Sequence, residues 1–143
     1  MRRLAPFRVL PLCALCCLSC HAGDASRTAC EPLAGEEITG LFADVIDRAA
    51  VEDGVGGTAL NHWCQDGRFV SRWTSPAGPG EIEGRWWVSG DLRCVSVEAP
   101  LPGDGATRRC VPLLRCGDRI ASVNAKGGIH GWHVLEPSPC PLD

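Results

Sequence analysis

Several features are missing from this chain of 143 residues: it has no tyrosine, a single methionine and, after the first 20 residues, no long apolar run. Charged residues, glycine or proline interrupt every later run before the roughly 18 apolar residues that a membrane-spanning helix needs. The motifs G-x-S-x-G, H-E-x-x-H and G-x-x-x-x-G-K, which mark nucleophilic, zinc-dependent and phosphate-binding sites, are also absent. The sequence therefore predicts no catalytic residues and no cofactor.

Positive charge is scarce in the same part of the chain. Arg2, Arg3 and Arg8 supply three of the 14 Lys and Arg residues, which leaves 11 against 17 Asp and Glu, a net charge of −6 without blocks of one sign. Because a nucleic-acid-binding protein needs a basic patch, the composition argues against nucleic acid as a partner. The roughly 120 residues that follow suffice for one hydrophobic core, and we expect a single domain over residues 36–143.

The N-terminus carries the features of an export signal. The three arginines precede the apolar run Val9–Leu18, whose length of about ten residues is typical of a signal-peptide core and too short for a bilayer. We expect residues 1–19 to form a signal peptide. The protein is then exported, either to the periplasm or to a lipid anchor in the outer membrane.

Two modes of cleavage fit the residues that follow. The tripeptide Leu-Ser-Cys ending at Cys20 resembles a bacterial lipobox, which makes a lipidated Cys20 the new N-terminus, although Cys17 stands where leucine is preferred. The alternative is ordinary cleavage after Ala22 or Ala25, because small residues occupy the required positions. The lipoprotein is favoured, and the polar residues 20–35 are predicted to form a flexible spacer.

Cysteine is abundant, with ten residues in the chain. Four of them lie at or before the predicted cleavage site, and six remain: Cys30, Cys64, Cys94, Cys110, Cys116 and Cys140. An even number of cysteines in an exported chain predicts disulfides. No C-x-x-C pair occurs among the six, which argues against zinc-ribbon and redox motifs.

Helical periodicity occurs once, in residues 36–49. Apolar residues recur there with the spacing of one helical stripe, at Ile38, Leu41, Phe42, Val45 and Ile46. Two glutamates precede the stripe and complement the dipole of the first turn. The segment is predicted to be an amphipathic helix that packs its stripe on the remainder of the domain.

Beyond Gly54 the sequence changes to short segments separated by turn signals such as Asp66-Gly67 and Gly90-Asp91, which indicate hairpins. Seven strands are predicted near residues 58–64, 68–74, 83–89, 92–98, 108–115, 119–125 and 129–135. The predicted fold is mainly β: one N-terminal amphipathic helix packed on a curled antiparallel meander or small barrel of about seven strands, stapled by disulfides.

The predicted hairpin over residues 83–98 contains adjacent tryptophans. With a loop of two residues at its tip, Trp86 faces Val95 and Trp87 faces Cys94 across the ladder. Trp86 then shares a face with valines and is predicted to lie in the core, whereas Trp87 lies on a more polar face. Trp87 is either a contact residue or a cover over a disulfide, and the cover is favoured.

The hairpin around residues 66 and 67 predicts the faces of two further tryptophans. A two-residue loop places Leu60, Cys64, Phe69 and Trp73 on one face and Trp63 with Val70 on the other. Leu60 and Trp73 are expected to be core partners. Trp63 is a candidate exposed aromatic, although a curled sheet can bury both faces near its ends.

Strand pairing about residue 102 predicts one disulfide. A symmetric hairpin opposes Cys94 and Cys110 at a Cα separation that a disulfide accepts, and the closed loop stabilises the domain by roughly 3 kcal/mol. The other four cysteines admit three pairings. Because terminal segments gain most from being tied down, we expect Cys64 to pair with Cys116 and Cys30 with Cys140.

Two histidines, His130 and His133, would share a face if the segment HGWH were helical. The surrounding glycines indicate a strand, in which residues three apart point to opposite sides. We therefore predict no metal site at these histidines.

Four segments, DGRFVSRW, GRWWVSGDLRC, RRCVPL and GDRI, follow the pattern D-G, G-x-W-x-V-x-G-D-x-x-C, C and G-D. In this pattern the chain resembles a group of small exported proteobacterial domains of unknown function, over about residues 36–135. The tryptophan of the pattern falls on Trp86 and its first two cysteines on Cys94 and Cys110. Trp87 occupies a position that is usually polar, and Cys64 stands near the place of a usual tyrosine. The resemblance implies the fold and export, and no activity.

Two functions are compatible with these features. The first is a non-enzymatic envelope binding module, inhibitor- or sensor-like, in which Trp63, Trp87 or Trp132 contacts an envelope protein or another ligand. The second is a structural envelope lipoprotein without a small ligand, whose only membrane contact is the N-terminal lipid. A large exposed apolar patch would favour the first function, and a uniformly polar surface the second.

Overall fold

Nine strands and one short helix form the part of the chain that the computed structural model describes, residues 29–52, 56–101 and 105–141. In chain order they are β1 (Cys30–Pro32), α1 (Gly35–Phe42), β2 (Val45–Val51), β3 (Thr58–Trp63), β4 (Arg68–Ser75), β5 (Gly78–Ser89), β6 (Leu92–Val97), β7 (Arg108–Cys116), β8 (Arg119–Val123) and β9 (Ile129–Pro137). The mainly-β fold and the seven predicted strands are confirmed.

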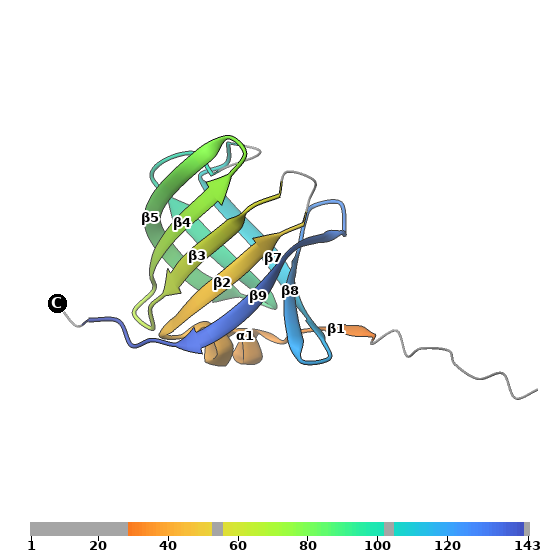
Figure 1. The fold of residues 1–143 in the computed structure, drawn as a ribbon. Helices are drawn as coiled ribbons and strands as arrows, with labels where there is room; N and C mark the ends of the chain where they lie inside the picture. The colour runs from red at the N-terminus through yellow and green to blue at the C-terminus, as the bar shows by residue number, and fades with distance from the viewer. Residues whose placement is uncertain (1–28, 53–55, 102–104, 142–143) are drawn as a thin grey trace, which may run out of the picture.

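Strands β2 to β9 form a closed antiparallel barrel (Figure 1). Each strand pairs with its neighbour in the chain, and β9 returns to pair with β2 along its whole length, which closes the barrel. Strand β1 lies outside this circuit and pairs with the end of β7 that β6 leaves uncovered. Closure leaves none of the eight barrel strands as an open edge.

Helix α1 closes one end of the barrel, as Figure 1 shows. Ile38 and Phe42 on its inner face are fully buried, and the Phe42 ring meets the Trp63 ring edge-on at 5.6 Å. The backbone N–H of Gly35 donates to the Asp91 carboxylate at 2.8 Å, which ties the start of the helix to the β5–β6 turn. The resulting apolar plug fills the lower end of the barrel.

The predicted helix over residues 36–49 is too long. It ends at Phe42, the backbone of Asp44 adopts a left-handed conformation (φ 56°), and the chain then forms β2. The apolar spacing of this segment fits both structures, and the backbone pairing of β2 with β3 and β9 decides in favour of the strand. The predicted spacer, 20–35, overlaps β1 and the first residue of α1, whereas the predicted signal peptide and Cys20 lie outside the described residues.

One disulfide prediction is confirmed and two are wrong. Cys94 opposes Cys110 in the β6–β7 ladder and is bonded to it, as predicted. The two other bonds are Cys30–Cys116 and Cys64–Cys140, in place of the predicted pairs. The two terminal cysteines are bonded to cysteines of the barrel and not to each other. Strand β1 brings Cys30 opposite Cys116, and the segment after β9 brings Cys140 to the end of β3. Three disulfides are compatible with an oxidising, exported compartment.

The predicted register of the β3–β4 hairpin is wrong by one residue. The loop has three residues, not two, because the N–H of Cys64 bonds to the carbonyl of Arg68 and Gly67 adopts a positive φ of 86°. A shift of one residue exchanges the two faces of a strand. Trp63 therefore lies opposite Phe69 in the core, with 2% of its surface exposed, and Leu60 faces outward at 37%.

No helix among the described residues is long and apolar enough to cross a membrane.

Candidate functional site

The barrel encloses a cavity of about 380 Å³, which we call the lumen. Its upper wall is largely apolar and includes Ala49, Trp73, Ile82, Val95 and Leu101. Small residues make room there: Gly131 has no side chain, and the Trp73 ring lies against Gly80, where a Cβ atom would be 2.1 Å from that ring. The volume falls in the range of small-molecule sites in proteins.

A polar layer lies below this apolar wall, at the level where the lumen meets the plug. It consists of the buried polar residues of the barrel: Asp47, Asn61, Ser71, Arg93, Ser122 and His133. Of these, all but Asp47 also line the lumen. They come from β2, β3, β4, β6, β8 and β9, so the barrel assembles the layer from almost every strand.

Asp47 is the centre of the polar layer and has no exposed surface. One carboxylate oxygen accepts hydrogen bonds from Asn61 Nδ2 at 2.9 Å and from Trp63 Nε1 at 3.2 Å. The ring nitrogen His133 Nδ1 lies 2.9 Å from the same oxygen and 3.0 Å from the other. Three donors from two strands, β3 and β9, thus saturate this carboxylate, as a buried charge requires.

The charge states of this pair follow from burial and hydrogen bonding. Burial raises the pKa of Asp47. The hydrogen bond and charge of His133, the charge of Arg93 and the hydrogen bond from Asn61 together lower this pKa by more, so that the net shift is downward. Burial, together with the charges of Arg93 and His130, lowers the pKa of His133, and the hydrogen bond and charge of Asp47 raise it by less, so that the net shift is downward. At neutral pH Asp47 is ionised, and His133 is a neutral imidazole whose Nδ1–H donates to Asp47.

Arg93 carries the positive charge of the polar layer. Its guanidinium lies between two aromatic rings, 4.6 Å from the Phe42 centroid and 4.4 Å from the Trp63 centroid. Burial lowers the pKa of Arg93 to about 10, against the opposing charge of Asp47, so the group remains charged at neutral pH. The two perpendicular rings hold the guanidinium at the base of the lumen.

Three buried polar atoms of this layer have no hydrogen-bond partner among the described residues: Arg93 Nη1, Ser122 Oγ and His133 Nε2. All three residues line the lumen. Buried polar atoms are normally paired, so three unpaired ones on residues that line a single cavity indicate a candidate site for an occupant. They offer a charged donor, a hydroxyl that can donate or accept, and a ring nitrogen that accepts.

Ser122, His133 and Asp47 are the residue types of a nucleophilic triad. Ser122 lies on β8 diagonally across from His133, because Ser122 opposes Gly131 and His133 opposes Ile120. However, Ser122 Oγ forms no hydrogen bond with His133 Nε2, the contact by which the base would activate the nucleophile. His133 therefore pairs with Asp47 but not with Ser122, and the three groups do not form a connected triad.

The predicted contact tryptophans lie in two different environments. Trp63, expected on the outside, lines the lumen instead. Trp87 and Trp132 are half-buried, and each has an arginine over its ring: Arg108 at 4.8 Å and Arg119 at 3.7 Å. Trp87 also opposes Cys94, which is fully buried, as expected for a cover over the Cys94–Cys110 disulfide.

A second depression, of about 850 Å³, lies over β2 to β5 and is shallower than the lumen. Its charged rim residues are paired, Arg48 with Glu136 and Arg72 with Glu81. Unlike the lumen, it contains no buried unpaired polar side-chain atom among the described residues. The lumen is therefore the better candidate site.

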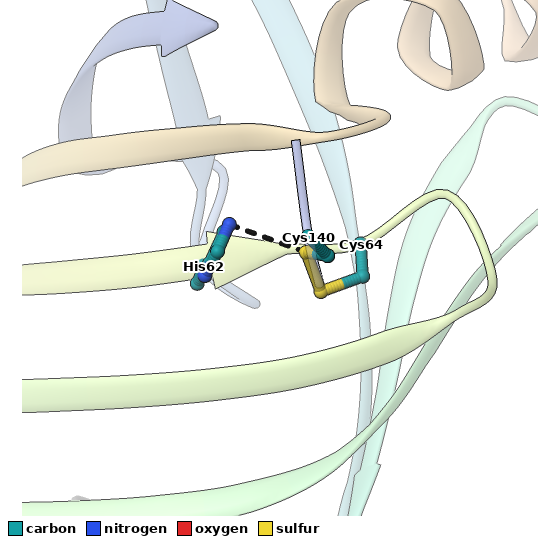
Figure 2. A group of neighbouring side chains, drawn as sticks. All are labelled: His62, Cys64 and Cys140. Atoms are coloured by element: carbon teal, nitrogen blue, oxygen red, sulfur yellow. Dashed lines mark hydrogen bonds between the residues drawn. A yellow bond between two sulfur atoms is a disulfide. The ribbon is translucent and has the colours of Figure 1, made fainter. Parts of the chain in front are cut away.

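His62, Cys64 and Cys140 form the one group of metal-ligating side chains that the described residues bring together (Figure 2). His62 Nε2 lies 3.2 Å from the sulfur of Cys140 and 3.0 Å from the carbonyl of Ser138. Both sulfurs belong to the Cys64–Cys140 disulfide and so are not thiolates, the form that binds metal. In this state His62 is a hydrogen-bond donor to the C-terminal segment.

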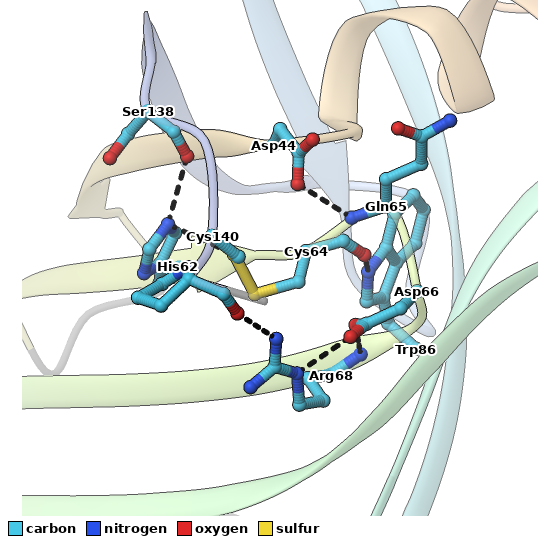
Figure 3. Close-up of a disulfide and its surroundings, with 10 residues drawn as sticks. Asp44, His62, Cys64, Gln65, Asp66, Arg68, Trp86, Ser138 and Cys140 are labelled. Carbon is cyan, nitrogen blue, oxygen red and sulfur yellow. Dashed lines mark hydrogen bonds and ion pairs between the residues drawn. A yellow bond between two sulfur atoms is a disulfide. The ribbon is translucent and has the colours of Figure 1, made fainter. Parts of the chain in front are cut away.

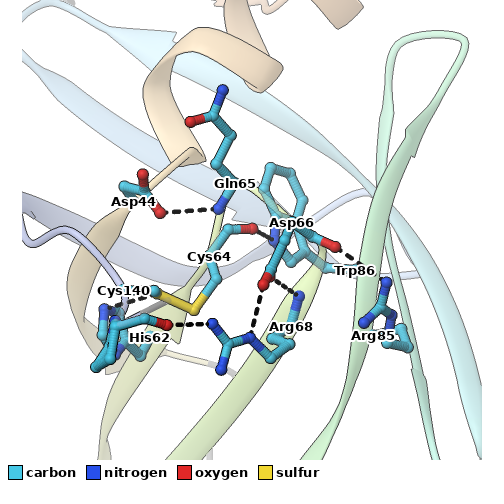
Figure 4. Close-up of polar contacts among 10 residues, drawn as sticks. Asp44, His62, Cys64, Gln65, Asp66, Arg68, Arg85, Trp86 and Cys140 are labelled. Atoms are coloured by element: carbon cyan, nitrogen blue, oxygen red, sulfur yellow. Dashed lines mark hydrogen bonds and ion pairs between the residues drawn. A yellow bond between two sulfur atoms is a disulfide. The ribbon is translucent and has the colours of Figure 1, made fainter. Parts of the chain in front are cut away.

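The surroundings of this disulfide secure the loop between β3 and β4 (Figure 3). The indole N–H of Trp86 donates to the Cys64 carbonyl at 2.7 Å, and Asp44 accepts from the backbone N–H of Gln65 at 2.9 Å. The Asp66 carboxylate forms an ion pair with Arg68 Nε at 2.7 Å, and Arg85 Nη2 donates to the backbone carbonyl of Asp66 at 3.0 Å (Figure 4). These polar groups are paired, so the cluster stabilises the closed end of the barrel and offers no open site.

Sequence reasoning missed most of the polar layer. Arg93 alternates with Val95 and Val97 on the inward face of a correctly predicted strand, so the sequence pattern was sufficient to predict that Arg93 points inward. Asp47 fell in the segment assigned to the helix, and Asn61 fell on the wrong face of the misregistered hairpin. His133 was expected to be exposed or hydrogen-bonded and not a metal ligand, but its partner Asp47 was not predicted, and the absence of a metal there remains a prediction.

Neither a protein-family model, nor a curated protein, nor a solved structure matches this chain.

Proposed function

We propose that this protein is a binding module that takes a small, partly apolar molecule into the lumen of its barrel. The observation that carries the proposal is the set of three unpaired buried polar atoms on residues at the base of a largely apolar cavity. Leaving a buried donor or acceptor unpaired costs about 1–3 kcal/mol each, and an occupant that pairs with them removes this cost. Eight-stranded barrels are wide enough to hold one such ligand.

We also propose that the module acts outside the cytoplasm, in the periplasm or anchored to the outer membrane by a lipid on Cys20. Three disulfides in one small domain support an oxidising compartment. A structural lipoprotein without a ligand is the second candidate. The arginines over Trp87 and Trp132 favour it, because they leave neither of the two outer tryptophans as a bare contact surface.

A cavity-filling substitution separates the two candidates. Nile red, an uncharged apolar dye, is titrated into the mature protein, and we expect saturable binding of one molecule. Ala49→Leu adds volume inside the lumen and should weaken binding at least about tenfold, because overpacking costs about 1–3 kcal/mol.

Ala50→Leu is the matched control, because Ala50 is the next residue of β2 and faces outward. It should leave the dissociation constant within about twofold. Circular dichroism verifies that both variants fold. Non-saturable binding to the wild type, or equal weakening by the two substitutions, would favour the structural lipoprotein.

A further inference from the structure

The three unpaired atoms at the base of the lumen have complementary requirements. Arg93 Nη1 is a charged donor and needs an acceptor, preferably an anionic one. His133 Nε2 is an acceptor, since Nδ1–H of the neutral ring donates to Asp47, and it needs a donor. Ser122 Oγ can serve either partner. An occupant that pairs with all three must present an acceptor and a donor side by side.

The two charges of the polar layer differ in how they are compensated. Asp47 accepts hydrogen bonds from three protein donors, whereas the guanidinium of Arg93 has aromatic rings on two sides and an unpaired Nη1. The anion is saturated and the cation is not. This difference selects an occupant with an oxygen acceptor at its inner end and disfavours a cationic one.

Resting on the proposed function, we propose that the lumen binds a monocarboxylic acid with an apolar tail, with the carboxyl group inward between Arg93, Ser122 and His133 and with one proton shared between that group and His133 Nε2. One carboxyl oxygen accepts from Arg93 Nη1. The other oxygen is linked through the proton to His133 Nε2. The tail then lies along Ala49, Trp73, Val95 and Leu101, toward the end of the barrel opposite α1.

The shared proton follows from the charges around His133. Asp47 faces it from β2, Arg93 from β6 and His130 from β9, and Arg109 of β7 lines the same cavity. At the base of the lumen the charges of Asp47 and Arg93 offset each other before a ligand binds, and Arg109 stands opposite Val95, beside the proposed tail and outside the buried polar layer. A bare carboxylate would therefore add a negative charge to a buried base whose own charges already balance. Uptake of one proton with the carboxylate keeps the site neutral, and the proton belongs to the coupled pair and not to either group alone.

The experiment compares two molecules with the same eight-carbon chain, octanoate and octylammonium, as competitors of Nile red. We expect octanoate to displace the dye at a concentration at least tenfold below that of octylammonium. Calorimetry of octanoate binding at pH 7.5, in two buffers of different ionisation enthalpy, should give about one proton taken up per molecule bound. A preference for octylammonium, or binding of octanoate without proton uptake, would overturn the proposal.

Two substitutions test the assignment to the polar layer. Arg93→Met keeps an unbranched side chain over the rings of Phe42 and Trp63 but removes the charge, and should weaken binding of octanoate at least tenfold more than binding of octylammonium. Ser122→Ala is a milder change and should weaken octanoate about threefold. Arg48→Met, on the outer face of β2, is the control and should change neither.

The results distinguish this inference from the function on which it rests. If Nile red binds in the lumen and octanoate binding is unchanged in Arg93→Met and Ser122→Ala, the carboxylic acid is wrong and a lumen ligand remains. If Nile red does not bind saturably to the wild type, the lumen function and the carboxylic acid fall together.

Discussion

The inner and outer faces of the barrel carry similar residue types, arginine and tryptophan, but differ in how these residues are paired and how deeply they are buried. On the outer face, charged groups meet partners near water: Arg48 meets Glu136, and Arg108 and Arg119 cover Trp87 and Trp132. On the inner face, the tryptophan rings line the core and cavity, and Arg93 is charged, buried and without a partner at Nη1. Among the buried side-chain atoms that the structure describes, those without a hydrogen-bond partner all belong to inward-facing residues.

The contrast between the two faces indicates where a ligand site can be recognised from the structure alone. Tryptophans predicted to be exposed are obvious candidates for ligand contacts, but a ring that is covered by an arginine side chain offers little free surface to a ligand. A buried donor without a partner is costly in water-free surroundings, so it persists where an occupant or a function compensates for it. The inner polar layer therefore carries more information on function than the outer tryptophans do.

The largest expected effect comes from removing the centre of the polar layer. Asp47→Ala leaves the donors of Asn61, Trp63 and His133 without an acceptor and Arg93 without a counter-charge, and should lower the free energy of unfolding by about 3–5 kcal/mol. On the outer face, Glu136→Ala removes an exposed ion pair and should cost at most about 1 kcal/mol. Urea unfolding measures both, and equal losses would break the contrast between the faces.

An intermediate effect is expected from pH. The folded-state pKa of His133 lies below its ordinary value of 6.5, so the unfolded chain binds its proton first as the pH falls. This contribution to stability is complete above about pH 7 and is lost as the pH falls below 6.5, by at most about 1.4 kcal/mol per pH unit. The pKa of Asp47 is also lowered, which adds a further loss below its ordinary value of 3.8.

Urea unfolding at pH 7.5, 6.5 and 5.5 checks the contribution of His133. His133→Gln should unfold with a shallower dependence on pH over this range than the wild type. Ser122→Ala alters the same layer without removing a titratable group and should keep the wild-type slope. An unchanged slope in His133→Gln would show that the imidazole is not the group that charges on unfolding.

The smallest effect is expected on the outer face. Trp132→Leu removes the stacking with Arg119 and should cost about 0.5–1 kcal/mol, the worth of an exposed cation–π pair. Nile red affinity should stay within about twofold, since Trp132 lies outside the set of residues that line the lumen. Trp73→Leu, inside the lumen, should change the affinity more than twofold. A larger effect from Trp132→Leu would reassign the binding surface to the outer face.

Local signals were sufficient for about half of the molecule. The turn residues gave seven strands, and the β5–β6 hairpin was predicted in the correct register, with Trp86 opposite Val95 and Trp87 opposite Cys94. The Cys94–Cys110 disulfide followed from the same reasoning, because its strands are joined by a single loop. These features depend on residues close together in the chain.

The errors concern long-range pairing and loop geometry. Strand β2 is defined by β3 on one side and by β9 on the other, and the residues that pair with it in β9 stand more than 80 positions away. The β3–β4 loop has one residue more than a two-residue turn, and the composition of the segment does not distinguish the two lengths. This extra residue shifts the register, so that Trp63 and Asn61 face inward. The candidate site joins Asp47 to His133, 86 positions apart, so it could be recognised only once the barrel was closed.

The pairing of β2 with β9 also determines when the barrel can form. The strand that closes it is the last to leave the ribosome, so during synthesis both β2 and the latest strand present unpaired edges. Contacts between residues so distant in sequence are slow to form, and all-β domains of this kind fold in milliseconds to seconds. The lumen, the polar layer and the Cys64–Cys140 bond are therefore late products of folding, and a chain halted before Ile129 has strands but no enclosed cavity.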